Sequence, residues 1–248
     1  MSGRKRVEGQ PAWLLHYRPF RDTSLILDLI TRDHGRLSVV ARGSRSARSR
    51  LRGILRPFLP LSISWVGRAE LGTMTGAEMN GPPVRLLGDA LMSGYYLNEL
   101  LLKLVPRHDP QPEIFEAYAA TIFTLQSEPA VARRLREFEL ELLRLLGYAV
   151  DLESDSGGRA ALRADLLYEY RVEQGAVPVS QRDGPMIFSG AELQAVARRD
   201  FDRAEVLASA ARLLRGVIAY HLDGRELLTR KVLRDMRRTA GPEAGRED

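Results

Sequence analysis

The 248-residue sequence contains no cysteine, and this absence removes several kinds of chemistry. A chain without thiols forms no disulfide bond, offers no thiolate nucleophile and holds no cysteine-ligated zinc. Lysine is nearly as rare, because 34 of the 37 basic residues are arginine. None of the three lysines, Lys5, Lys103 and Lys231, follows a glycine-rich loop, which argues against a P-loop nucleotide site.

The histidines and carboxylates show no catalytic or metal-binding spacing. The four histidines fall in different segments, without a pattern such as HExxH. The stretch DLESDSG (151–157) resembles the start of a calcium loop, but Ser156 stands where glycine is needed and Leu162 where the bidentate glutamate belongs. We therefore predict a protein that is not an enzyme and that uses no metal and no cofactor.

Long hydrophobic runs are also missing. No window approaches the roughly 18 consecutive apolar residues that a membrane span requires. The N-terminal stretch MSGRKRVEGQP has no apolar region behind its basic residues, as a signal peptide would have. We expect a cytoplasmic protein with no membrane partner.

Charge is present in quantity but is unevenly distributed. Residues 1–81 contain 14 basic and 6 acidic residues, a balance of +8, whereas residues 82–248 contain 23 and 26, a balance of −3. A basic excess confined to one part of a chain indicates a polyanionic partner for that part, most often nucleic acid.

The first third of the chain has the alternating pattern of short β-strands. SLILDLIT (24–31) places Leu25, Leu27 and Leu29 on one face, and RLSVVAR (36–42) follows after a turn. Three further segments, at 11–18, 59–67 and 69–76, give about five strands with no long helix between them. We therefore predict a five-stranded OB-type barrel, the N-terminal part of an α+β protein.

The pattern becomes helical after the turn NGPPVR (80–85). Helices are expected at 86–106, 112–127 and 128–148, and again from the capping box SGAE at Ser189 and over 203–222. We expect an OB-type nucleic-acid-binding domain at 1–81 and a helical domain at 82–241. The helical domain would contain a cysteine-free insertion at 149–190 with a β-hairpin at 166–179. Residues 242–248 are expected to be a disordered tail.

Residues 42–56 carry six arginines and no carboxylate, directly after a predicted strand. So many cations in one loop repel one another unless a polyanion such as a phosphate backbone binds them. Tyr17, near Arg18 and Arg21, could stack on bases or pack in the core, and Trp65 presents the same two alternatives. A solvated charge run without a partner is the alternative for the loop. The predicted DNA-binding residues are Arg42, Arg45, Arg48, Arg50, Arg52, Arg56, Arg36 and Tyr17.

One helix of the predicted C-terminal domain combines an apolar stripe with arginines. In VARRLREFELELL (131–143), Leu135, Phe138 and Leu142 recur at helical spacing next to basic residues. Such a face could dock an acidic hydrophobic peptide. The alternative is a core stripe bordered by solvated charges.

Taken together, these segments resemble the RecO family of bacterial recombination mediators. The resemblance rests on YRPFRDTSLILDLITRDHGRLSVVARGSR (17–45), YYLNELLLKLV (95–105) and RRLREFELELLRLLGY (133–148). It implies a protein that binds and anneals single-stranded DNA and that, with RecR, helps RecA load onto strands coated by the single-strand-binding protein SSB. Double-stranded DNA is a second candidate partner, and the implied location is the bacterial nucleoid.

The resemblance also has consequences for particular residues. Many members of the family carry a four-cysteine zinc site after the LGY helix, but residues 149–190 have no cysteine, so no metal is expected there. The family's contact with the acidic SSB tail uses an arginine in this helix, which corresponds to Arg136.

Two other functions stay open at this stage. An RNA-binding OB protein would show the same basic barrel, since nothing in the sequence identifies a contact to a 2′-hydroxyl. An assembly adaptor that binds an acidic protein subunit through the arginine-rich loop would do so as well.

Overall fold

We describe the protein from a computed structural model that covers residues 6–67, 71–127, 130–158 and 160–232. The chain forms two compact units. The first comprises Met1–Ser127 together with the chain from Leu227 onward, and the second comprises Glu128–Glu226. The first unit thus includes the helices predicted at 86–106 and 112–127, which the sequence analysis placed in the helical domain. The tail predicted at 242–248 lies outside the described residues.

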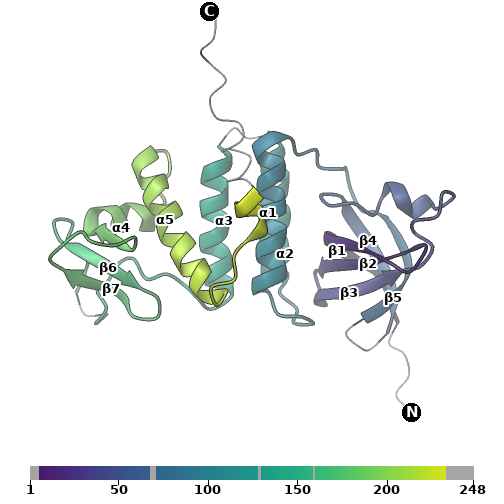
Figure 1. Cartoon of the computed structure of the whole chain (residues 1–248), viewed down its shortest axis with the longest axis horizontal. Helices are drawn as coiled ribbons and strands as arrows, with labels where there is room; N and C mark the ends of the chain where they lie inside the picture. The colour runs from purple at the N-terminus through teal and green to yellow at the C-terminus, as the bar shows by residue number, and fades with distance from the viewer. Residues whose placement is uncertain (1–5, 68–70, 128–129, 159, 233–248) are drawn as a thin grey trace, which may run out of the picture. The chain divides into compact units, whose positions relative to one another are not determined.

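Five strands close into a barrel in the first unit (Figure 1). They are β1 (Arg6–Phe20), β2 (Ser24–Thr31), β3 (Gly35–Ala41), β4 (Pro60–Val66) and β5 (Leu71–Met79), in the spatial order β1-β2-β3-β5-β4. β3 and β5 pair in parallel, which closes the cylinder, while the other neighbours pair antiparallel. The OB-type barrel predicted from the sequence is confirmed.

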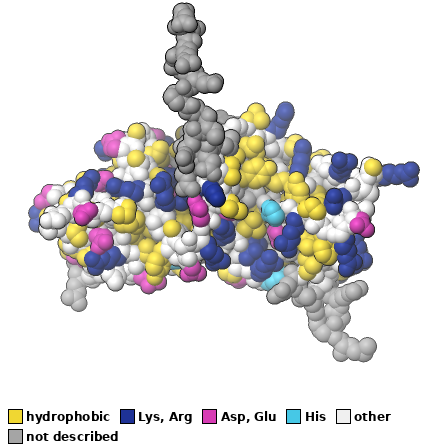
Figure 2. Space-filling view, in the orientation of Figure 1, with side chains coloured by type: hydrophobic (Ala, Val, Ile, Leu, Met, Phe, Trp, Pro, Cys, Tyr) yellow, Lys and Arg dark blue, Asp and Glu magenta, His cyan; other side chains and the backbone are white. Residues whose placement is uncertain are grey.

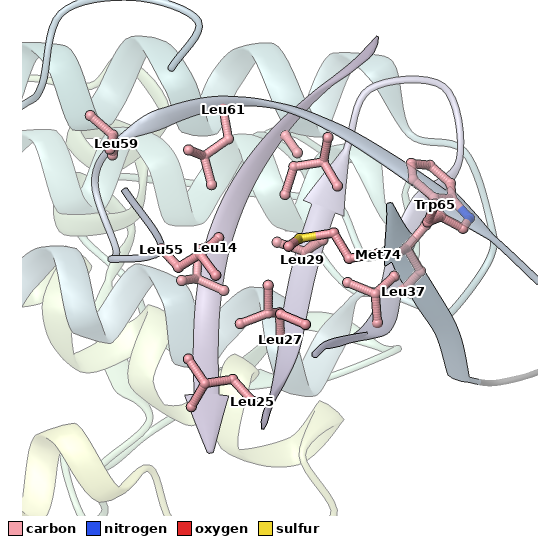
Figure 3. Packing of buried hydrophobic residues seen from close by; sticks show 14 of the residues in the cluster. Leu14, Leu25, Leu27, Leu29, Leu37, Leu55, Leu59, Leu61, Trp65 and Met74 are labelled. Carbon is pink, nitrogen blue, oxygen red and sulfur yellow. The ribbon is translucent and has the colours of Figure 1, made fainter. Parts of the chain in front are cut away.

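The barrel interior is filled by leucine, isoleucine and valine. Leu27 and Leu29 of β2, Leu14 of β1 and Leu61 of β4 point inward and are fully buried (Figure 3). Trp65 lies in the same cluster. Of the two positions proposed for Trp65, the structure therefore shows the one in the core.

Two helices of the first unit, α1 (Gly88–Leu104) and α2 (Pro112–Ser127), cover the outside of β1 and β2. Asn98 of α1 donates a hydrogen bond to the carbonyl of Leu15, at 2.9 Å, and accepts one from the Tyr118 hydroxyl, at 2.6 Å. The Trp13 ring packs edge-on against the ring of Tyr118, with the centroids 5.7 Å apart. This cover explains why β2 is buried on both faces instead of alternating between core and solvent.

The second unit combines helices with a small sheet. Its elements are α3 (Val131–Leu145), β6 (Leu167–Arg171), β7 (Gly175–Val179), β8 (Ile187–Ser189), α4 (Gly190–Ala197) and α5 (Ala204–His221). β6 and β7 form the predicted hairpin, and β8 adds a third strand beside β6. Ser189 and Glu192 form the predicted capping box at the start of α4. No helix among the described residues has the length and apolar character needed to cross a membrane.

Candidate nucleic-acid interface

The arginine-rich segment, residues 42–56, is an ordered loop, which we call the arginine loop. It leaves β3 through Gly43, whose φ of 65° favours glycine. The hydroxyl of Ser44 donates to the carbonyl of Ala41 at 2.9 Å, and Ser49 caps the short 3-10 helix Arg50–Gly53. These local bonds give the loop a defined path without using its arginines.

Apolar residues of the loop attach it to one end of the barrel. Leu55 is buried in the barrel core, and Leu51 and Ile54 pack against that core while remaining partly exposed. Because these apolar residues alternate with Arg50, Arg52 and their neighbours, their burial directs the guanidinium groups outward. The barrel thus holds a group of cations at a fixed site.

All six loop arginines are exposed. Within the described part of the chain, none of them forms an ion pair with a carboxylate, and Arg45 instead donates to the backbone carbonyl of Arg21 at 3.4 Å. Figure 2 shows Lys and Arg side chains protruding where Figure 1 places this loop. The loop therefore presents positive charge that the described carboxylates do not neutralise.

The structure adds the turn between β1 and β2 to this surface. The backbone amide of Arg45 donates to the carbonyl of Thr23 at 2.9 Å, so the turn and the arginine loop are held together. Arg21 lies in this turn with its guanidinium 5.2 Å from the centre of the Phe20 ring, and Arg18 is exposed on the adjoining end of β1. Sequence analysis noted these two arginines only as neighbours of Tyr17, because the bond from Arg45 joins residues 22 positions apart.

Tyr17 is 46% exposed, as a base-stacking residue must be. It lies on β1, paired with Leu27 of β2. At about 3.3 Å per residue, its Cα is within about 13 Å of the turn that contacts the arginine loop. Of the two positions proposed for this ring, the structure shows the accessible one.

Arg36 is not part of this group. It lies at the start of β3, whereas Arg42 follows the other end of the strand, about 20 Å away at 3.3 Å per residue. Its Nε donates to the carbonyl of Val105 at 2.8 Å. Burial and the neighbouring Arg107 lower the pKa of Arg36, an effect that Asp28 partly offsets. The side chain connects the barrel to the end of α1.

A polar cluster close to Arg36 occupies the outer face of the barrel. The buried carboxylate of Asp28 accepts a hydrogen bond from the Ser38 hydroxyl, and Arg107 donates to the same hydroxyl oxygen at 2.9 Å. His16 Nδ1 is 3.6 Å from Asp28. The carboxylate lies between the serine and the histidine, so the imidazole is not placed to accept a proton from the hydroxyl. The cluster connects three strands to the loop after α1.

Arg136 is the residue predicted to hold an acidic SSB tail. It lies on α3 with its side chain 13% exposed, and its Nη2 is 2.6 Å from the wholly buried carboxylate of Glu139. Phe138 and Leu142 of the same helix are buried. The apolar stripe therefore contributes to the core of the second unit, and Arg136 is already engaged by a carboxylate of its own helix.

Comparison with known proteins identifies the family to which this chain belongs. A family model described as Recombination protein O N terminal matches residues 7–82, and one described as Recombination protein O C terminal matches residues 86–231. A protein named DNA repair protein RecO from Azoarcus sp. (strain BH72) is 43% identical over 240 residues, covering 95% of this chain and 99% of that protein. The chain belongs to the RecO family.

Two further RecO proteins support this membership. The protein of that name from Methylococcus capsulatus (strain ATCC 33009 / NCIMB 11132 / Bath) is 43% identical over 92% of this chain and 94% of its own length. The one from Dechloromonas aromatica (strain RCB) is 41% identical over 95% of this chain and 99% of its own length. The two RecO models divide the chain between residues 82 and 86, whereas the compact units divide it after Ser127.

Proposed function

We propose that this protein acts in DNA repair as a recombination mediator that binds single-stranded DNA and anneals complementary strands. The observation that carries the proposal is the group of exposed arginines on one end of the barrel. Eight arginines lie on the arginine loop and the adjoining part of β1 and its turn, and within the described residues none forms an ion pair with a carboxylate. They are Arg18, Arg21, Arg42, Arg45, Arg48, Arg50, Arg52 and Arg56.

Such a surface binds the phosphate backbone and not particular base sequences. Each guanidinium that binds a phosphate releases condensed counterions, which increases both affinity and salt dependence. Phosphate contacts position a strand but carry no sequence information, so the base edges stay available for pairing. Neutralising two strands at once lowers the repulsion that opposes their annealing. The proposed activity makes and breaks no covalent bond.

Tyr17 would add a stacking contact to one base of the bound strand. An exposed aromatic ring beside a basic groove is how many OB-fold proteins hold single strands without choosing a sequence. We leave Arg36 out of the proposed surface, because its Nε is bonded to Val105 and it lies at the opposite end of β3.

The partner proteins in this proposal are SSB, RecR and RecA. Binding of the acidic SSB tail would recruit the protein to coated strands, and RecR would act with it in loading RecA. The contact between Arg136 and Glu139 limits how Arg136 can take part. Carboxylates of the tail would have to replace Glu139 at that guanidinium, or bind the more exposed Arg133 and Arg134 nearby.

The test removes the charge of the arginine loop and measures how salt affects DNA binding. A variant with Arg45, Arg48, Arg50 and Arg52 replaced by Ala is titrated with a fluorescent oligonucleotide at several salt concentrations. Because single strands give a slope near −0.7 per neutralised phosphate, losing four contacts should flatten the plot of log K against log salt by up to about 3. An unchanged slope would exclude the loop from the interface.

The matched control replaces four exposed arginines of the second unit that pair with carboxylates. Arg163, Arg171, Arg199 and Arg203 pair with Asp165, Glu169, Glu141 and Glu205, respectively. This variant has the same net charge as the loop variant but should keep the slope of the unmodified protein. Titration with RNA of the same sequence tests the RNA-binding alternative. If the unmodified protein bound neither oligonucleotide at low salt, the assembly adaptor would be favoured.

A further inference from the structure

A hollow of about 1050 Å³ opens in the second unit, where α3 and α5 end beside the turn between β6 and β7. Figure 1 shows the C-terminal ends of the two helices side by side, and a ring contact between Tyr148 and His221 agrees with this. The aromatic and charged residues that line the hollow are Tyr148, Tyr170, Glu173, Tyr220, His221 and Asp223. The hollow belongs to the second unit, whereas all the residues proposed to bind DNA belong to the first.

Aromatic rings form one wall of this hollow. The rings of Tyr148 and His221 are stacked, with their centroids 3.9 Å apart and their planes 17° apart. Tyr220 meets His221 edge-on at 5.4 Å. Tyr148 is 43% exposed and Tyr220 50% exposed, so part of each ring is available to a ligand. The faces of such rings are negative and attract cations.

The charged residues that line the hollow, Glu173 and Asp223, are both acidic. Glu173 accepts a hydrogen bond from the Tyr220 hydroxyl, and its charge raises the pKa of that hydroxyl. Asp223 follows the last turn of α5, where helix carbonyl groups already concentrate partial negative charge. No lysine or arginine occurs among the lining residues, and burial lowers the pKa of His221, which keeps its ring neutral at pH 7. The hollow is therefore electronegative.

The backbone at both carboxylates is in the left-handed region. Glu173 has φ 70° in the β6–β7 turn, and Asp223 has φ 51° after α5. Glycine or asparagine is the usual residue at such positions, and a glutamate there carries a conformational cost. Both turns thus hold a carboxylate at the edge of the hollow in spite of that cost.

We propose that this hollow binds an arginine side chain on a basic segment of a partner protein. A guanidinium can stack on a tyrosine face while its planar fork binds a carboxylate, and this hollow offers both. Nucleic acid is disfavoured because its phosphates would meet the carboxylates of Glu173 and Asp223 as well as the C-terminal ends of α3 and α5. Arg225 Nη2 lies 3.7 Å from Asp223, and Arg225 Nε donates to the carbonyl of Leu222 at 3.0 Å. Both side chains of the ion pair are exposed, so a ligand can compete for Asp223 at little cost.

The experiment titrates the full chain with an acetylated, amidated peptide Gly-Arg-Gly-Arg-Gly by calorimetry. A peptide with citrulline in place of arginine keeps the shape and removes the charge. We expect the arginine peptide to bind about three- to tenfold more tightly than the citrulline peptide. Glu173→Gln should reduce its affinity by a similar factor, whereas Glu169→Gln should not, because Glu169 pairs with Arg171 outside the hollow.

Several results would overturn this assignment. If the citrulline peptide bound as tightly as the arginine peptide, the hollow would not select a positive charge. If Glu173→Gln kept both its melting temperature and its affinity for the arginine peptide, the Glu173 carboxylate would not bind that peptide. If Glu173→Gln abolished self-association of the chain, the occupant would be the arginine loop of a second copy instead of a partner protein. DNA binding is measured in the same variants and should stay unchanged, so this test is independent of the proposed function.

Discussion

Glu99 accepts two hydrogen bonds from Thr229, one from its backbone amide at 2.9 Å and one from its hydroxyl at 2.7 Å, across 130 positions of the sequence. The same carboxylate accepts the amide of Leu228 and pairs with Lys103. Arg230 adds a hydrogen bond to the Tyr96 hydroxyl at 2.7 Å. Residues 227–232 are thereby fastened to α1, and the first unit includes a segment made after the whole second unit.

Replacing Glu99 with Gln should weaken this attachment. Burial alone would raise the pKa of Glu99, but the hydrogen bonds from Thr229, Leu228 and Lys103 outweigh it and lower the pKa below the ordinary 4.5. The ionised form is therefore the one that stabilises the fold. We expect Glu99→Gln to lower the free energy of unfolding of the first unit by about 1–2 kcal/mol at pH 7, measured by urea denaturation.

The pH dependence follows from the direction of that shift. The contribution of Glu99 is complete above about pH 4.5 and is lost as the pH falls through the lower pKa of the folded state. The difference between Glu99→Gln and the unmodified protein should therefore shrink in acid. Glu78→Gln, at an exposed position on β5, is the control and should change stability by less than about 0.5 kcal/mol. An equal effect in both variants would contradict the attachment.

Alanine substitutions at two glycines near the ends of β3 can distinguish the cost of backbone strain from the cost of a steric clash. Both Gly35 and Gly43 have φ 65°. A Cβ at Gly35 would lie 2.1 Å from the carbonyl oxygen of Asp109, whereas nothing lies within 4 Å of one at Gly43. Gly43→Ala should cost about 1 kcal/mol from its backbone conformation, and Gly35→Ala about 1–3 kcal/mol more. Thermal denaturation compares the two, and equal costs would exclude the close approach at Asp109.

Replacing Arg36 with Ala should affect stability and not DNA binding. The substitution removes the hydrogen bond to the Val105 carbonyl, a loss of about 1–2 kcal/mol. The salt slope of DNA binding should stay the same, because Arg36 is remote from the arginine loop. If the variant instead had a flatter salt slope and unchanged stability, Arg36 would bind DNA, as predicted from the sequence.

Two substitutions of Tyr17 test whether its ring stacks on a DNA base or its hydroxyl forms a hydrogen bond with the DNA. Tyr17→Ala should weaken binding of single strands by about 1–3 kcal/mol, while Tyr17→Phe, which keeps the ring, should bind nearly as well as the unmodified protein. Fluorescence anisotropy with an oligonucleotide measures both. Full affinity in Tyr17→Ala would show that the ring lies away from the bases.

The local patterns in the sequence were sufficient for most of the elements. Alternation at Leu25, Leu27 and Leu29 predicted β2, and the capping box at Ser189 predicted the start of α4, because both depend on neighbours in the chain. The arginine loop was visible for the same reason. These features need no knowledge of distant contacts.

What sequence reasoning missed depends on contacts between distant segments. The pattern of β2 does not show that α1 and α2 cover the side of the strand that carries Asp28, or that Ser38 and Arg107 bind its carboxylate. Arg36 was predicted to bind DNA because nothing in the local sequence shows that the end of α1 lies beside it and accepts its hydrogen bond. β8 escaped notice because three residues are too few for a periodic pattern.

The fastening of residues 227–232 to Glu99 also has a consequence for protein synthesis. A ribosome makes the barrel and α1 first, then the 99 residues from Glu128 to Glu226, and only afterwards the segment that covers Tyr96 and Glu99. The nascent barrel therefore spends that interval with one side of α1 uncovered, open to chaperones or to premature contacts, and a fragment ending at Ser127 would keep this exposed surface permanently.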